Sequence, residues 1–491
     1  MRRGTTDAPS AWHRHALRVM GSDRRVVIAG AGVAALEVLL ALRAHELPGL
    51  DIHVLAPGES FLYEPVSVAE AFELGEAREF DVGTIIAEQG ARRHADTLAS
   101  VDTAAKTVRT GAGEALGYDE LVIALGARAV PALPGALTFR GRRDVPALRE
   151  ILRELEVGRV RRVAFALPPE NAWPLPIYEL ALMAAGFISS RELDARIVLV
   201  SCEEQPLELF GSRASDAIKE LLHARGILLC LPALTRVFED GALHLAGGGS
   251  VIADRAVALP RLEGPSIPGL PADDGGFIPI DMHGRVKGVE GVYAAGDVTA
   301  FPLKQGGLAA QQADAIADLI AHRAGAAVAP RPFSAVIRGL LLTGGAPIYL
   351  RAGPGTLRRD ASVANERRTP WPAGRARVES RSSTRPLWWP PSKVAGRYLA
   401  PYLASARPMA GGVTAALADY PPVPDSTIDR SDALELALLL ADYDARWGDH
   451  AMALSVLDSA EALAGDLPPE WAERRREWRM ALAKETAGRR A

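Results

Sequence analysis

The sequence predicts an α/β fold with two successive βαβ series, in which the chain returns to the first series after completing the second. Residues 26–42 start with the apolar run from Val26 to Ile28, pass through a glycine-rich turn and end in an apolar helical pattern. A second alternation of apolar runs and helical patterns occupies residues 162–231. Such alternation indicates βαβ units with parallel sheets. The 491 residues are too many for one core and suggest about three domains.

The turn after the first strand has the composition of a dinucleotide-binding loop. Gly30 allows a sharp turn, Gly32 leaves no Cβ between the backbone and a pyrophosphate, and Ala35 lets the helix lie close to the strand. The phosphates would bind backbone N–H groups at the helix start, where the helix dipole favours negative charge. The alternative is a tight turn of an ordinary α/β domain.

The segments that follow could complete the same site. The second strand, residues 51–55, ends at Ala56, where a dinucleotide fold often has an acid for a ribose hydroxyl, so this acid is missing or replaced by Glu59. Pro65 lies in a segment that would pass over the cofactor, and its ring could pack against a flat ligand. A later apolar strand ends in small residues at Gly126, which permits a second close backbone approach, although ordinary buried strands share this pattern.

The second series is separated from the first by a break at residues 131–135. Its first strand and helix are joined by residues 168–176, which contain four prolines and no glycine. Because proline removes backbone donors and glycine is needed for close approach, this turn is poorly suited to a pyrophosphate. We therefore expect a second Rossmann-like domain with weakened or lost nicotinamide binding.

The chain then returns to the first domain with a short strand that has Asp297 at its tip. Asp297 could hydrogen-bond the hydroxyls of a linker chain, or it could be an ordinary helix or turn cap. A helix is expected from about residue 308 to residue 323, after Lys304-Gln305-Gly306-Gly307. The positive end of this helix could stabilise negative charge on a reduced isoalloxazine ring.

Composition excludes several classes of function. The net charge of −4 does not call for nucleic acid or an anionic membrane as a partner. Cys202 and Cys230 are spaced neither as a CxxC pair nor as metal ligands, so we expect two buried thiols in a reducing cytoplasm and no metal. No run of about 18 apolar residues could span a membrane, and residues 1–23 lack the apolar core of a signal peptide.

Beyond Pro330 the character of the sequence changes. Residues 351–386 are rich in Arg, Ser and Pro and are expected to form a mobile loop. Residues 387–403 mix aromatic and cationic side chains, which suits peripheral membrane contact, although an intramolecular lid or a dimer contact fits equally well. Residues 430–485 predict two or three amphipathic helices, over about 433–446, 451–464 and 468–483, that pack on the body or on a partner.

Three short motifs, in this order, resemble the fingerprints of flavoproteins with two dinucleotide-binding domains. They are Gly30/Gly32/Ala35, Ala124-Leu125-Gly126 and Ala295-Gly296-Asp297, within about residues 24–340. In that superfamily the chain is most similar to sulfide:quinone oxidoreductases and type II NADH dehydrogenases. The similarity is seen in residues 61–65, 174–179 and 304–307.

The resemblance implies FAD on the first motif, electron transfer at flavin N5 and a quinone-like acceptor near the C-terminal segment. The cofactor-binding residues so implied are Gly30, Gly32, Ala35, Pro65, Gly126, Gly296, Asp297, Gly306 and Gly307. Lys304 and Glu179 are the catalytic candidates, Lys304 beside the flavin and Glu179 as the counterpart of an acid that faces the flavin in relatives. The alternative for Glu179 is a surface residue of a helix.

Two departures from the family pattern leave the electron donor open. Trp173 stands where sulfide oxidation in the family would need a cysteine, and the CxxxxC pair of disulfide reductases is absent. The sequence thus predicts an FAD-dependent oxidoreductase with small-molecule donor and acceptor. The alternatives are an NAD(P)H dehydrogenase with an altered nicotinamide loop and a flavin-binding sensor or scaffold without turnover.

The expected organisation has five parts. They are a disordered extension (1–23), an FAD-binding domain (24–135 and 264–340), a second Rossmann-like domain (136–263), a C-terminal interface segment (341–427) and a helical tail (428–491). We expect a cytoplasmic protein, with peripheral contact at the inner face of the membrane and homodimerisation as further possibilities.

Overall fold

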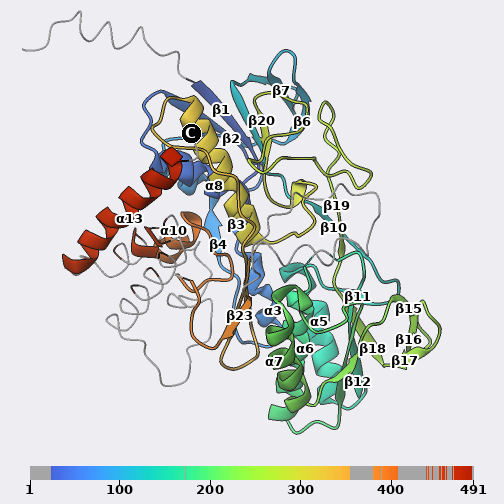
Figure 1. Cartoon of the computed structure of the whole chain (residues 1–491). Coiled ribbons are helices and arrows are strands. Elements are labelled where there is room, and N and C mark those ends of the chain that lie inside the picture. The colour runs from blue at the N-terminus through green and yellow to red at the C-terminus, as the bar shows by residue number, and fades with distance from the viewer. Residues whose placement is uncertain are drawn as a thin grey trace, which may run out of the picture.

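The computed structural model describes residues 24–171, 173–353, 380–388, 390–406 and 469–488, together with single positions between 438 and 467. In this part of the chain, two five-stranded parallel sheets lie at the centres of two βαβ units (Figure 1). The predicted α/β fold with two Rossmann-like units is therefore confirmed.

The first sheet has the strand order β20-β9-β1-β2-β5, and every pairing in it is parallel. Its strands are β1 (Arg24–Ala29), β2 (Leu50–Leu55), β5 (Arg92–His94), β9 (Glu120–Ile123) and β20 (Val292–Ala294). Because the late strand β20 pairs with β9, the first unit is discontinuous, as the sequence predicts. Shorter elements of this unit are β3 (Ser60–Leu62), η1 (Glu64–Val66), α3 (Ser67–Glu70), β4 (Glu79–Asp81) and η4 (Gly296–Val298).

Alternate residues of the central strands face two different layers. Val26 and Ile28 pack on the side of three helices, α2 (Val33–Ala44), α4 (Val82–Glu88) and α8 (Gly306–Arg323). Val27 and Ala29 face an antiparallel sheet of β6 (Leu98–Asp102), β7 (Thr107–Thr110) and β8 (Ala115–Gly117). A continuous apolar run is needed because both faces of the sheet are covered.

The second unit repeats this plan. Its sheet has the order β11-β18-β12-β13-β14, formed by β11 (Leu137–Thr138), β12 (Arg162–Leu167), β13 (Arg196–Ser201), β14 (Leu228–Cys230) and β18 (Arg255–Ala258). Its other elements are η2 (Arg142–Asp144), α5 (Val145–Glu156), α6 (Leu175–Ser190), η3 (Glu208–Phe210), α7 (Ser212–Ala224), β15 (Thr235–Glu239), β16 (Ala242–Leu245) and β17 (Ser250–Ile252). Two crossovers between the units run antiparallel to each other, as β10 (Arg128–Val130) and β19 (Arg261–Glu263).

A third sheet, formed after α8, packs on the core of the second unit. It is antiparallel and consists of β21 (Ile337–Leu341), β22 (Ile348–Ala352) and β23 (Ser380–Ser383). The expectation of a loop over residues 351–386 is wrong at both ends, because β22 extends to Ala352 and β23 pairs with it. A polar edge strand needs only its backbone for this pairing, so its sequence lacks the apolar alternation that marks a strand.

The aromatic and cationic stretch that follows is folded against its own chain. Trp388 is 2% exposed and stacks edge-on against Tyr349 at a centroid distance of 5.1 Å. Helix α10 (Leu399–Ser405) lies on the core of the first unit. Intramolecular packing, one of the three alternatives, is confirmed at these residues, whereas membrane and dimer contacts stay predictions. No helix among the described residues is long and apolar enough to cross a membrane.

Of the predicted tail, the structure describes mainly α13 (Pro469–Gly488), which matches the helix expected over 468–483. Its Trp471 and Trp478 stack edge-on, and Trp478 is buried. Apart from single positions, the helices expected over 433–446 and 451–464 lie outside the described residues.

Candidate functional site

The glycine-rich turn lies at the carboxyl edge of the first sheet. Gly30 has φ +121°, and its N–H donates to the carbonyl oxygen of Leu55 at 2.9 Å. A Cβ on Gly30 would lie 2.2 Å from the carbonyl oxygen of Ala124. The ends of β1, β2 and β9 therefore meet here at backbone contact, which is possible only because residue 30 has no side chain.

Two other glycines of the predicted site border open space. A Cβ on Gly32, the N-cap of α2, would meet no atom within 4 Å, and the same holds for Gly126. No side-chain hydrogen bond caps α2. Ala35 is buried one helical turn further on, so the helix lies close to the sheet. Uncapped N–H groups beside an open surface at a helix start suit the pyrophosphate of FAD.

Gly296 lies where two helices approach each other and does not border open space. Its φ is +79°, and a Cβ there would lie 3.2 Å from that of Ala34 and 3.4 Å from that of Ala309. Its N–H donates to Oε1 of Gln312 at 2.7 Å. This glycine thus lets η4 pack between α2 and α8, and it brings Asp297 close to the start of α2.

Asp297 and Lys304 interact electrostatically at the carboxyl edge of β20. Burial raises the pKa of Asp297, and the charge of Lys304 opposes that rise. The Lys304 ammonium donates to the carbonyl oxygens of Asp297, at 3.1 Å, and of Thr299. It also lies 3.8 Å from the ring centroid of Phe277. Lys304 therefore holds the loop that carries Asp297, and its charge remains close to the predicted cofactor site.

The start of α8 is covered by a later segment of the chain. Gln305 caps the helix by accepting from the Leu308 N–H at 2.8 Å. A Cβ on Gly306 would lie 2.8 Å from a methyl group of Val394, whereas one on Gly307 would meet the Gln305 side chain at 3.1 Å. Glycine at position 306 is thus explained by contact with Val394, which sequence reasoning missed.

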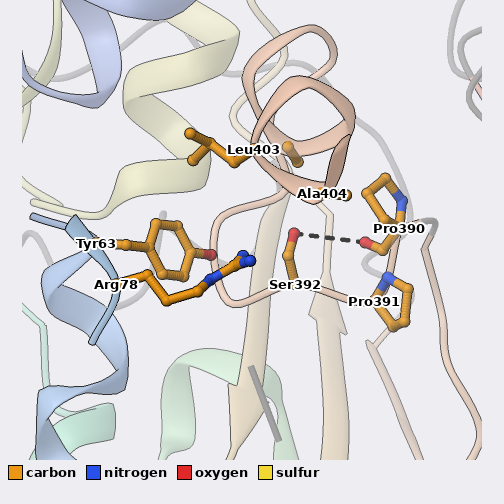
Figure 2. Close-up of a pocket in the computed structure, with 8 residues that line it drawn as sticks. Tyr63, Arg78, Pro390, Pro391, Ser392, Leu403 and Ala404 are labelled. Atoms are coloured by element: carbon orange, nitrogen blue, oxygen red, sulfur yellow. Dashed lines mark hydrogen bonds between the residues drawn. The ribbon is translucent and has the colours of Figure 1, made fainter. Parts of the chain in front are cut away.

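Pro65 occupies the short η1 turn that borders the same region. The preceding Tyr63 is buried, and its hydroxyl accepts from the Val394 N–H at 2.8 Å. Figure 2 shows Tyr63 and Arg78 on one side of a small pocket, facing Ser392 and Pro391 of the later segment. The segment predicted to pass over the cofactor is therefore held by residues near 394.

Glu179 is fully buried, so the alternative of a surface glutamate is wrong. Lys393 donates to both of its carboxylate oxygens, at 2.5 and 2.6 Å, and the Leu342 N–H donates to Oε1 at 2.8 Å. Burial raises the pKa of Glu179, and Lys393 opposes the rise. The reason for the burial is that α6 is apolar around its whole circumference, as helices in a protein interior are.

Hydrogen bonds of the Asn171 side chain close the proline-rich turn between β12 and α6. The Asn171 side chain donates to the carbonyl oxygen of Pro260 at 2.9 Å and accepts from the Trp173 N–H at 2.8 Å. The Trp173 ring stacks edge-on against Phe210 at 6.1 Å. The turn is thereby fixed to the segment after β18, with no glycine to admit a phosphate. These residues do not fit the pyrophosphate of NAD(P)H.

The acid after β13 is also unsuited to a nicotinamide cofactor. In a dinucleotide fold an acid near this strand end binds a ribose. Here Glu203 is buried, and its Oε2 accepts from the hydroxyls of Tyr178, at 2.5 Å, and Ser201, at 2.9 Å. Burial raises its pKa to about 7. Its carboxyl group is thus used inside the domain.

Residues 24–317 match the family model described as pyridine nucleotide-disulphide oxidoreductase. The chain belongs to this family. It is accordingly an FAD-dependent oxidoreductase, as the sequence predicts. The open cradle beside Gly32 and Gly126 fits FAD, which supplies the redox chemistry when bound.

Named relatives of this oxidoreductase are about a quarter identical to it over somewhat more than half of its length. The ferredoxin–NAD(+) reductase component of a biphenyl dioxygenase system from Paraburkholderia xenovorans is 26% identical over 308 residues, 57% of this chain and 69% of the relative. An NADH dehydrogenase-like protein of Mycobacterium tuberculosis is 28% identical over 298 residues, 56% of this chain and 73% of the relative.

Among solved structures, the sulfide:quinone oxidoreductase of Aquifex aeolicus is similar with a TM-score of 0.63. The sequence identity is 18%, and the match covers 74% of this chain and 87% of that one. At this identity the similarity concerns the fold.

The cysteines of this oxidoreductase are both free and partly buried. Burial and then the neighbouring Glu203 raise the pKa of Cys202 to about 11. A thiol with this pKa is almost wholly protonated at neutral pH and is a poor nucleophile. Among the described residues, moreover, no group of His, Cys, Asp and Glu side chains is placed to hold a metal ion.

Proposed function

We propose that the protein transfers electrons through FAD from a small-molecule donor other than NAD(P)H to a quinone-like or other small acceptor. The observation that carries this proposal is the closed turn between β12 and α6. The Asn171 side chain closes it by donating a hydrogen bond to the carbonyl oxygen of Pro260. A nicotinamide donor would need this turn open at the carboxyl edge of the sheet. The quinone-like acceptor is supported by the motif resemblance of residues 174–179 and 304–307.

The site residues have the following proposed roles. Gly30 provides the sharp turn, Gly32 and Gly126 admit the pyrophosphate, and Ala35 permits close helix packing. Gly296 and Asp297 place an acid near the linker hydroxyls of FAD, and Pro65 borders the flavin. Lys304 and the helix start at Gly306 and Gly307 supply positive potential to the ring, while Glu179 with Lys393 is a proton-handling candidate.

An NAD(P)H dehydrogenase is the second candidate, because two named relatives are a ferredoxin–NAD(+) reductase component and an NADH dehydrogenase-like protein. Stopped-flow mixing of the oxidised protein with NADH, NADPH, sulfide and a reduced quinone, without oxygen, separates the two. We expect no rapid loss of the flavin absorbance with NADH or NADPH, and reoxidation of chemically reduced protein by a soluble quinone. Reduction by either nicotinamide within a turnover time would contradict the proposal and favour the second candidate.

Two substitutions of Asn171 test whether the closed turn excludes nicotinamides. Asn171→Ala removes both hydrogen bonds that close the turn, whereas Asn171→Asp keeps the acceptor for the Trp173 N–H and loses the donor to Pro260. If the closed turn excludes nicotinamides, the alanine variant binds NADH more tightly than the wild type, as measured by calorimetry. Tight NADH binding to the wild type itself would contradict the argument from the turn.

A further inference from the structure

Two glutamates occupy equivalent positions in the two units. Glu37 stands four residues after Val33, the first residue of α2, and Glu179 stands four residues after Leu175, the first residue of α6. Each helix follows the central strand of its unit's sheet, β1 or β12. Both carboxylates are fully buried. A buried carboxylate is costly unless other groups compensate its charge, so each needs a partner.

Both glutamates find that partner in one short segment, residues 390–403. Lys393 binds the carboxylate of Glu179 through two short contacts. Five residues later, the N–H of Tyr398 donates to Glu37 at 2.8 Å, and the next N–H, of Leu399, donates at 2.7 Å. The segment is therefore bound, through a buried acid, to the helix that follows the central strand of each unit. We call residues 390–403 the clasp.

The part of the clasp between the two acids fits closely over the first unit. Val394 packs on Gly306 at the start of α8, and its N–H donates to Tyr63. A Cβ on Gly396 would lie 2.7 Å from Oε2 of Glu37, so the backbone touches the carboxylate directly. Pro391 and Ser392 face Tyr63 across the small pocket of Figure 2. The clasp thus crosses the helix start that is proposed to lie beside the flavin ring.

The charged side chains around Glu37 also favour binding of the clasp. Burial raises the pKa of Glu37 and raises that of Asp314, on α8, well above its usual range. Arg397 of the clasp opposes the rise in both pKa values. The clasp therefore brings a cation to the acids of each unit, Lys393 to Glu179 and Arg397 to the pair of Glu37 and Asp314.

We propose that the clasp joins the two units across the edge of the FAD site and controls how fast FAD leaves the protein. In this scheme Glu37, Glu179 and Lys393 act on FAD release as positioning residues, through the clasp, and this role is separate from the proton handling proposed for Glu179. The proposal depends on FAD binding at the first unit and not on the identity of the electron donor. FAD release is measured without donor or acceptor, so its result is independent of the test of the proposed function.

The test compares Lys393→Met and Glu37→Gln with a control, Glu120→Gln, in the full chain. Glu120 is also buried, ion-paired to Arg24 at 2.6 Å and hydrogen-bonded to Tyr293 at 2.9 Å, but it begins β9 at the opposite end of the sheet. The FAD dissociation rate is followed by the rise of flavin fluorescence after dilution. The melting temperature of each apoprotein is measured separately.

We expect FAD to dissociate at least about tenfold faster from both clasp variants. Lys393→Met leaves the buried Glu179 carboxylate without its cation, and Glu37→Gln removes one of the two oxygen acceptors for the N–H groups of Tyr398 and Leu399. The Glu120→Gln control should release FAD at a rate within about twofold of wild type. This should hold even if its melting temperature falls as much as those of the clasp variants. Release rates that follow the melting temperature across all three variants would overturn the proposal. If Lys393→Met does not fold, Val394→Ala, which keeps every charge, should still accelerate release, and an unchanged rate in that variant would also overturn it.

Discussion

Gly30 and Ala124 are in contact through their backbones, and a Cβ on Gly30 would lie 2.2 Å from the carbonyl oxygen of Ala124. Gly32, two residues later, has no atom within 4 Å of its own Cβ position. The two glycines of one motif therefore have different reasons to be glycine. The first is required by the fold itself, and the second is required by the proposed ligand.

This difference predicts opposite outcomes for two substitutions. Gly30→Ala should destabilise the apoprotein by at least ~2 kcal/mol, because it combines a positive φ with a steric overlap. Gly32→Val should leave the apoprotein within about 1 kcal/mol of wild type but remove the yellow FAD, since the side chain would fill the pyrophosphate position. Urea unfolding of apoprotein and the flavin absorbance after purification measure the two effects. Full FAD occupancy in Gly32→Val would mean that the cofactor lies elsewhere.

The cysteines are expected to have no redox role. Replacing Cys202 and Cys230 by Ala should leave turnover within a few-fold, because the raised pKa of Cys202, about 11, keeps its thiol protonated. For the same reason, alkylation of Cys202 by iodoacetamide should be slow below about pH 10. Loss of flavin reduction in either single variant, with normal FAD content and fold, would restore a thiol mechanism.

The sequence predicts the strands of the core well and the contacts of the C-terminal segment poorly. Strands β12 and β13 lie within the alternation predicted over residues 162–231, because a parallel strand covered on both faces is a continuous apolar run. Pairing between Glu179 and Lys393 joins residues 214 positions apart, and no local pattern encodes such a partner. One signal was present, since the helix around Glu179 is apolar on all sides, which indicates burial of its single acid.

The sequence also does not predict what lies beside each glycine. A sequence shows that Gly306 needs no side chain, but it does not show whether a ligand or another part of the chain fills the space. In the structure Val394 fills it.

Glu203 should make stability fall as the pH rises through the weakly acidic range. Burial raises its pKa from 4.5 to about 7 in the folded state, so between these values the unfolded chain loses the proton while the folded chain keeps it. The stabilising contribution is complete below about pH 4.5 and is lost as the pH approaches 7. Its size is roughly 3 kcal/mol, from about 1.4 kcal/mol per pKa unit.

Comparison with Glu203→Gln isolates this contribution from the other carboxyl groups, because glutamine can still accept from Tyr178 and Ser201. The free energy of unfolding of the wild type, relative to the variant, should fall between pH 4.5 and 7 in urea titrations. A difference that stays constant over this range would show that Glu203 is ionised in the folded protein throughout.

Lys304 and the start of α8 are expected to raise the midpoint potential of the flavin by their positive potential. A positive charge or helix start near the ring contributes about 0.3 to 2 kcal/mol, and ~30 mV corresponds to about 1.4 kcal/mol for a two-electron couple. Lys304→Ala should therefore lower the flavin midpoint potential by some tens of millivolts at most. It should also cost stability, because the carbonyl oxygens of Asp297 and Thr299 lose their donor.

Asp297→Ala should chiefly weaken FAD retention, since the carboxylate is the group proposed to hold the linker hydroxyls. Spectroelectrochemical titration and FAD binding to the two apoproteins decide the matter: an unchanged potential in the first variant, or unchanged affinity in the second, would place these residues away from the cofactor.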